Sequence, residues 1–285
     1  MPDLSVLADK WLIVRIFGLP CGIAIDHVRE LMSINDRPIV ALPGYGPDLV
    51  GVLRLRDRVI PVVDLRTVLG FPSMAEENRG LLGLLTERER DHVNWITELE
   101  ACVAENRPFR LATDPHACKF GKWYDALMGD EATLLRTTNG DRTLERHFRQ
   151  IDGPHQRIHG IAQAVAAAVD GGRAEEGRVL IERTRSTDLA AIVNLFTEMR
   201  RCIAEVRRPQ IVVLERGERH IGALVDAVDA VQEIPADEIE PAGDDQLDSA
   251  DISGFTRRIE EASGKVISLL RTEAIFNRLG VPVLS

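Results

Sequence analysis

Long apolar runs are missing from this sequence. No stretch of 18 or more apolar residues occurs among its 285 residues, so no transmembrane helix is expected. The first five residues lack the basic start and apolar core of a secretory signal. The few cysteines, at positions 21, 102, 118 and 202, are irregularly spaced, which favours reduced thiols over a disulfide framework. We therefore expect a cytoplasmic protein that does not insert into a membrane.

Basic residues are also fewer than acidic residues in this sequence. The chain has 35 Lys and Arg against 45 Asp and Glu, and its formal net charge of −10 argues against a nucleic-acid-binding surface. No nucleotide-binding glycine motif occurs, which argues against a kinase. The hydrophobic fraction of 45% is ample for buried cores, and the length suggests one or two domains.

Strand-like segments fill the first 70 residues. Turn residues at 18–20 and charged residues at 56–58 separate β-branched runs, which is typical of hairpins. Asp26 and Asp64 precede short segments that we expect to be helical, because an aspartate can cap a helix. The expected strands are 11–17 with 21–25 and 49–55 with 59–63; the expected helical segments are 28–30 and 65–69; 39–42 leads into a turn at Pro43-Gly44.

The last 75 residues return to the same strand pattern. Two further hairpins are expected, one around Arg216-Gly217-Glu218 and one around Ser263-Gly264. The acidic segment 237–251 is expected to be a loop. The expected strands are 211–214 with 220–225, 228–234, and 252–259 with 265–270, followed by a helix over 272–279.

Between these β-rich segments, apolar residues recur at helical spacing. The predicted helices run from about Glu76 to Asn106, within 128–145 around a turn at 138–140, from Pro154 to Gly171-Gly172, and from Ser186 to Val206. An insertion must leave and re-enter its host at one place, and an even number of antiparallel helices does so. We therefore predict an N-terminal β half at 1–75, an inserted four-helix bundle at 76–207 and a C-terminal β half at 208–285.

Histidine and cysteine residues in the helical segment have metal-ligand spacing. His155 and His159 lie one helical turn apart, so both imidazoles face the same side. His92 and Cys118 complete the four Cys and His ligands that structural zinc prefers. Taken singly, each of these residues also fits an ordinary structural role without metal, such as a packed core thiol or a half-buried polar residue.

Together, these residues and their neighbours resemble the chemoreceptor zinc-binding (CZB) domain. The matching segments are His92-Val-Asn-Trp95, Cys118-Lys-Phe-Gly121-Lys-Trp123 and His155-Gln-Arg-Ile-His159. The resemblance implies a four-helix bundle that holds Zn²⁺ through His92, Cys118, His155 and His159, with Trp95, Gly121 and Trp123 supporting the site. His147 is an alternative ligand, and His116 is expected in a loop.

The β segments resemble the CheW-like domain, the adaptor of bacterial chemotaxis arrays. The matching segments include Val28-Arg-Glu-Leu31, Gly51-Val-Leu-Arg-Leu-Arg56, Val59-Ile-Pro-Val-Val-Asp-Leu-Arg66 and Gly222-Ala-Leu-Val-Asp-Ala-Val228. The resemblance implies an α+β protein in which two small five-stranded β-barrels flank the inserted bundle. It also implies that Glu30 and Arg56 lie at a partner surface, although both also fit ordinary exposed charges.

These resemblances imply a non-enzymatic signalling adaptor at chemoreceptor arrays. Its expected partners are a chemoreceptor signalling tip and a histidine kinase of the CheA type, with a homodimer as a further expectation. The zinc domain is expected to sense zinc or hypochlorous acid. Two rivals remain: a zinc module that only spaces the barrels, and a zinc hydrolase. The second is disfavoured because Gln156, not Glu, follows His155 and four protein ligands leave no position for water.

Overall fold

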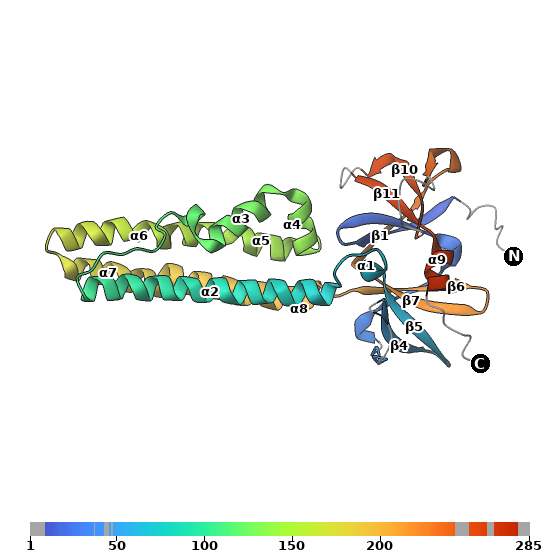
Figure 1. Cartoon of the computed structure of the whole chain (residues 1–285), viewed down its shortest axis with the longest axis horizontal. Helices are drawn as coiled ribbons and strands as arrows, with labels where there is room; N and C mark the ends of the chain where they lie inside the picture. The colour runs from blue at the N-terminus through green and yellow to red at the C-terminus, as the bar shows by residue number, and fades with distance from the viewer. Residues whose placement is uncertain are drawn as a thin grey trace. The chain divides into compact units, whose positions relative to one another are not determined.

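The chain folds into a β unit and a helical unit (Figure 1). The computed structural model describes residues 9–36, 38–42, 46, 48–242, 251–260 and 265–278. The β unit comprises Met1–Glu77 and Arg208–Ser285, and the helical unit comprises Asn78–Arg207. No helix in the described part of the chain is long and apolar enough to cross a membrane.

A six-stranded sheet forms one part of the β unit. Its strands pair in the order β8-β1-β2-β11-β10-β9, antiparallel except for β11 with β2. The strands are β1 (Lys10–Ile16), β2 (Leu19–Ala24), β8 (Ala227–Glu233), β9 (Ile239–Pro241), β10 (Ile252–Glu260) and β11 (Lys265–Leu270). Because β1 pairs with β8 and β2 with β11, strands from both ends of the sequence share this sheet.

A five-stranded sheet forms the other part, in the order β3-β6-β7-β5-β4. Its strands are β3 (Val28–Ser33), β4 (Leu49–Leu55), β5 (Arg58–Asp64), β6 (Gln210–Arg216) and β7 (Arg219–Val225). Here too the halves join, since β3 pairs with β6 and β5 runs parallel to β7. The prediction of one β host interrupted by a helical insertion is confirmed.

The α+β fold class is confirmed, with changes of detail in the barrels. One sheet has six strands instead of five, because Ile239–Pro241, in the segment expected to be a loop, pairs with β10. Among the described residues the strand order of each sheet is open, so the sheets are barrel-like without closing. The turns expected at Pro43-Gly44 and Ser263-Gly264, the end of the last helix at 279, and part of the acidic loop fall outside the described residues.

One local prediction in the first half is wrong. Residues 28–30 belong to strand β3 instead of a helical turn, because pairing with β6 outweighs the weak capping signal of Asp26. Asp26 instead lies inside a 3₁₀ turn, Ile25–His27. Residues 39–42 contribute only one bridge, between Val40 and Val52.

Short helices and one buried ion pair complete the β unit. Asp64 caps α1 (Leu65–Val68), as expected, by accepting from the Arg66 amide at 2.9 Å. The Arg66 side chain is 2% exposed, and its guanidinium donates to both carboxylate oxygens of Asp226, at 2.5 and 2.8 Å. A third bond, of 2.8 Å, runs from Arg66 to Glu77. Helix α9 (Thr272–Arg278) follows β11.

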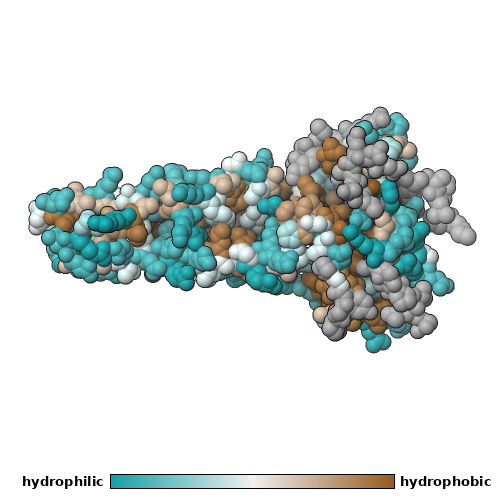
Figure 2. All heavy atoms as spheres, viewed as in Figure 1, coloured by the Kyte–Doolittle hydropathy of each residue, from teal (hydrophilic) through white to brown (hydrophobic). Residues whose placement is uncertain are grey.

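The helical unit, which is described throughout, consists of four helical runs. They are α2 (Met74–Ala104); α3 (Lys119–Gly129) with α4 (Glu131–Thr138); α5 (Arg142–Gln150) with α6 (Asp152–Asp170); and α7 (Ala174–Thr184) with α8 (Ala190–Val206). The predicted turn at 138–140 is present, with Asn139 in the left-handed conformation. In Figure 1, α2 runs alongside α7 and α8, and α6 lies across from them. The visible face of this unit is mostly hydrophilic (Figure 2).

The last helical run begins earlier than expected. The sequence predicts a helix start at Ser186, but the helix already runs from Ala174 and passes through a π turn, Arg185–Leu189. Ser186 and Thr187 do not cap a new helix. Their hydroxyls donate to upstream carbonyls, those of Glu182 and Arg183, which is the alternative open to such side chains inside a helix.

A single apolar core fills the bundle. It draws buried side chains from every run, including Leu85, Ile96, Phe120, Phe148 and Phe196. Burial of several aromatic and branched residues is the main source of stability for such a core, at roughly 1.5–3 kcal/mol each. Among these apolar side chains lie three buried histidines.

Candidate metal centre and partner surface

Four predicted ligands, far apart in the sequence, come together inside the bundle. His92 is on α2, Cys118 precedes α3, and His155 and His159 are on consecutive turns of α6. One ligand atom from each lies within 4.8 Å of the others. Ligand atoms about 2.0–2.3 Å from a tetrahedral zinc ion lie roughly 3.3–3.8 Å apart, so a small contraction of the group would suit the ion.

Hydrogen bonds fix which nitrogen of two imidazoles faces the centre. The Nδ1 atom of His92 lies 2.6 Å from the Arg88 carbonyl oxygen, and that of His159 lies 3.1 Å from the Ala112 carbonyl oxygen. A carbonyl only accepts, so each Nδ1 carries the proton and each Nε2 keeps its lone pair. Both Nε2 atoms are buried without a hydrogen-bond partner among the described residues. A buried unpartnered lone pair is costly, and a metal ion would satisfy it.

The Cys118 sulfur is held by the start of helix α3. It accepts from the Gly121 amide at 3.1 Å and lies 3.3 Å from Nε2 of His155, a distance typical of two ligands on one ion. A Cβ atom on Gly121 would stand 1.9 Å from the Pro115 carbonyl oxygen. Glycine is therefore required at position 121. Any side chain there would clash with the Pro115 carbonyl and displace the Gly121 amide from the Cys118 sulfur.

Burial sets the protonation of the ligands in the metal-free protein. It lowers the pKa of His155 to about 3 and that of His159 to about 4, with the neighbouring histidines adding to the effect, and it also lowers the pKa of His92. The imidazoles are therefore neutral near pH 7, the form that binds a metal. Burial raises the pKa of the Cys118 thiol, so metal binding would release its proton.

Aromatic side chains enclose the centre. The Trp95 indole donates to the Ala112 carbonyl oxygen at 2.8 Å, so that carbonyl meets both Trp95 and His159. The Phe120 ring packs on His155 and His92, at centroid distances of 4.8 and 5.5 Å. Trp123 lies one layer further out, against Phe120. Sequence reasoning missed Phe120, although it sits between Cys118 and Gly121, and it had no means of finding the Ala112 carbonyl, which is backbone.

The other two candidate histidines of this unit are not part of the group. His116, expected in a loop, lies in the short 3₁₀ helix Pro115–Ala117; its side chain is 60% exposed and pairs with Asp125 at 2.9 Å. His147, considered as an alternative ligand, lies on α5 and is not among the four clustered residues.

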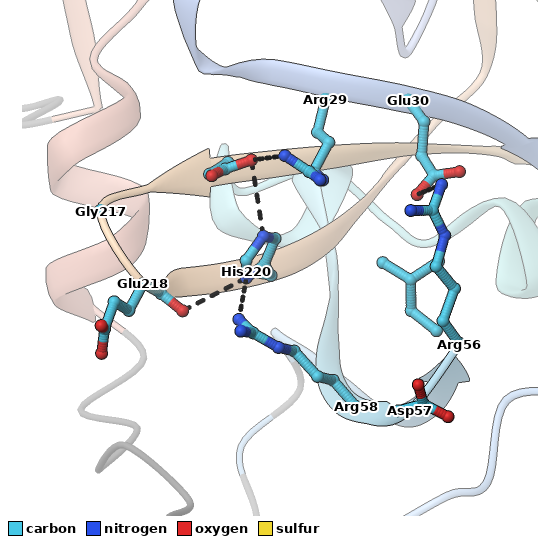
Figure 3. Close-up of a pocket in the computed structure, with 10 residues that line it drawn as sticks. Arg29, Glu30, Arg56, Asp57, Arg58, Gly217, Glu218 and His220 are labelled. Atoms are coloured by element: carbon cyan, nitrogen blue, oxygen red, sulfur yellow. Dashed lines mark hydrogen bonds and ion pairs between the residues drawn. The ribbon is translucent and has the colours of Figure 1, made fainter.

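The two predicted partner-surface residues face one another across a hollow of the β unit (Figure 3). Arg56, in the β4–β5 turn, points toward Glu30 on β3, with 3.8 Å between Nη2 and Oε1. Arg29, Arg58 and His220 also line this hollow of about 390 Å³. The Arg56 side chain is 71% exposed, so the pair adds little stability and leaves the guanidinium open to another molecule.

Comparisons with known proteins follow the same division of the chain. Residues 10–93 and 187–280, together more than half of the chain, match the family model of the CheW-like domain, and residues 92–166 match that of the chemoreceptor zinc-binding domain. Among solved structures, the chain is similar to the scaffolding protein TtCheW from Thermoanaerobacter tengcongensis. The identity is 13% and the TM-score 0.40, over 93% of this chain and 89% of that chain. A comparison with curated proteins finds no match.

Proposed function

Since this chain belongs to the CheW-like family, we propose that it is a chemotaxis-type signalling adaptor with a zinc-responsive insert. In this proposal the β unit couples a chemoreceptor to a histidine kinase of the CheA type, in the cytoplasm at receptor arrays. The exposed Arg56 beside Glu30 supports a polar contact with one of these partners. A second copy of the chain is a further candidate partner, through the helical unit.

The observation that carries the metal assignment is the convergence of His92, Cys118, His155 and His159 within 4.8 Å, with two ligand nitrogens buried and unpartnered. Three imidazoles and one thiolate are a donor set that zinc accepts. When bound, zinc would supply four strong bonds that tie α2, the start of α3 and α6 together, and it would hold Cys118 as a thiolate. The match of residues 92–166 to a zinc-binding family supports the same assignment.

Two chemistries would make this centre responsive. Loss of zinc would leave the Nε2 atoms of His92 and His159 buried without a partner and loosen the helices that carry the four ligands. Alternatively, an oxidant such as hypochlorous acid would convert the Cys118 thiolate to a sulfenic acid and weaken the site. The single sulfur ligand, only partly buried, favours the second route.

A structural zinc module without sensing is the main alternative. It predicts that metal removal changes stability but not signalling. A zinc hydrolase is less well supported, because four side chains from the protein fill a tetrahedral site and leave no position for an activated water.

The test reconstitutes receptor, kinase and this protein, and it measures kinase activity with zinc-loaded, chelated and oxidant-treated protein. We expect one zinc per chain and a change of kinase activity when zinc is removed. Cys118→Ser should bind zinc more weakly and lose the oxidant response. Cys202→Ser, which removes a buried thiol outside the group, is the matched control. Unchanged kinase activity after zinc removal would favour the structural module, and normal zinc content in Cys118→Ser would refute the ligand assignment.

A further inference from the structure

A hollow separate from the metal centre opens on the surface of the helical unit between α2 and α3. Its volume is about 390 Å³. Arg79, Gly80, Gly83, Leu84 and Arg88 of α2 line it together with Lys119 and Trp123 of α3. We call it the α2–α3 hollow.

The charge of the α2–α3 hollow opposes that of the chain. Three cationic side chains and the carboxylate of Glu87 line it. Arg88 pairs with Glu87 at 2.9 Å and with Asp91, outside the lining, at 3.2 Å, so the positive charge rests mainly on Arg79 and Lys119. Arg79 and Lys119 make no ion pair with any residue that the structure describes. The Arg88 Nε atom is buried and lacks an acceptor within the same set of residues. A protein with a net charge of −10 thus carries a local positive site.

The floor of the hollow is kept open by two glycines. Gly80 and Gly83 lie inside the long helix α2, where each glycine costs about 1 kcal/mol relative to alanine. A Cβ atom at either position would meet nothing within 4 Å, so packing does not require glycine. The space beside both glycines belongs to the hollow, and a side chain placed there would occupy it.

The hollow is joined to the metal centre through two of its residues. Arg88 lies one turn before His92, and its carbonyl oxygen contacts the Nδ1 atom of that ligand. Lys119 directly follows Cys118. Burial raises the pKa of the Cys118 thiol; the charge of Arg88 lowers this pKa, and the charge of Asp91 raises it. Cys118 itself does not line the hollow, but an anion held by Lys119 would be bound by the residue next to Cys118 in the chain.

We propose that the α2–α3 hollow binds small oxyanions and delivers anionic oxidants to Cys118, so that anionic oxidants react there faster than neutral ones of similar chemistry. This inference rests on the proposed role of Cys118 as the reactive ligand. With peroxymonosulfate, the thiolate attacks the peroxide oxygen that carries hydrogen and the O–O bond breaks. Sulfate leaves with the electron pair, and the sulfur, oxidised by two electrons, becomes a sulfenic acid that keeps the hydroxyl proton.

The experiment compares peroxymonosulfate, an anion, with hydrogen peroxide, a neutral peroxide, on the zinc-loaded full chain. Oxidation of Cys118 is followed by mass spectrometry after rapid quenching. Lys119→Gln and Arg79→Gln should each slow the reaction with peroxymonosulfate by about threefold or more and leave the reaction with hydrogen peroxide unchanged. Lys119→Arg should restore the rate. Added salt should slow the anionic reaction of the wild type more than that of Lys119→Gln.

Two further variants separate a local site from general effects. Arg178→Gln removes an exposed charge on α7 that does not line the hollow, and it should change neither rate. Gly83→Leu should fill the hollow without weakening the helix, and it should slow the reaction with peroxymonosulfate. The proposal is overturned if Lys119→Gln and Arg178→Gln have equal effects, or if Lys119→Gln slows both oxidants equally. The zinc content of Cys118→Ser tests the ligand assignment separately. The ratio of the rates with peroxymonosulfate and hydrogen peroxide does not depend on that assignment.

Discussion

Two sets of buried polar side chains, one in each unit, are satisfied in opposite ways. In the β unit, the buried guanidinium of Arg66 is bonded to both carboxylate oxygens of Asp226 and to Glu77. In the helical unit, His92 and His159 each use one ring nitrogen for a backbone carbonyl and bury the other without a partner among the described residues. The first arrangement is complete in itself, whereas the second is completed only by a ligand.

This difference separates a structural polar group from a binding site. A buried charge with all its partners in place fixes packing and gains nothing from a further molecule. Several buried lone pairs directed at one point carry an uncompensated cost of desolvation, and a cation bound there would remove that cost. The β unit should therefore depend for stability on its own side chains alone, and the helical unit on its apolar core together with its metal.

Breaking the buried pair of the β unit should have the largest effect. Asp226→Ala leaves Glu77 as the only carboxylate paired with the buried Arg66 among the described residues, which should lower the free energy of unfolding by about 3–5 kcal/mol. Denaturant unfolding of the full chain measures the loss, and zinc content measured in parallel should stay at the wild-type value. Loss of zinc in Asp226→Ala under native conditions would mean that the two units are not independent in this respect.

Removing zinc should have a comparable but slightly smaller effect, on the other unit. If free zinc stands at 100–1,000 times its dissociation constant, chelation lowers stability by about 3–4 kcal/mol. Hydrogen exchange should accelerate in α2, α3 and α6, which carry the four ligands, and not in β5 or β7. Equal acceleration in strands and helices would contradict the division of roles.

Sequence patterns sufficed for most of this architecture because the signals were local. Turn residues such as Gly217 sit where two β-branched runs reverse, and the His155–His159 spacing already sets both rings on one side of a helix. The candidate ligand set was implied by the resemblance of three short motifs to the CZB domain. None of these inferences needed the distance between remote segments.

Features that depend on remote contacts were beyond the sequence. The Arg66–Asp226 pair joins residues 160 positions apart, and no sequence pattern near either residue predicts that they pair. Strand β3 forms because β6, from the far half of the chain, pairs with it. The Ala112 carbonyl supports the metal centre through its backbone, so its side chain carries no signal.

Weakening the support of a ligand should have a smaller effect than losing the metal. Trp95→Phe keeps an aromatic ring against His159 but removes the indole bond to the Ala112 carbonyl oxygen. Zinc affinity should fall about tenfold, as for other changes next to a metal ligand. Competition with a chromophoric chelator measures it. Trp123→Phe is the control, because Trp123 packs on Phe120 and Phe148 and on no ligand ring among the described residues. An equal loss of affinity in that variant would assign the effect to packing alone.

The smallest effect on stability should come from the exposed pair of the β unit, which contrasts with its buried pair. Arg56→Gln breaks a 3.8 Å contact at a side chain that is 71% exposed, so the free energy of unfolding should change by less than about 0.5 kcal/mol. If Arg56 contacts a partner, the same variant should weaken binding to receptor or kinase, as measured by co-sedimentation with receptor arrays. Glu30→Gln removes the other half of the pair and should be equally mild for folding. A variant that loses stability but not binding would reassign Arg56 to the fold, and unchanged binding in both variants would remove this hollow from the partner surface.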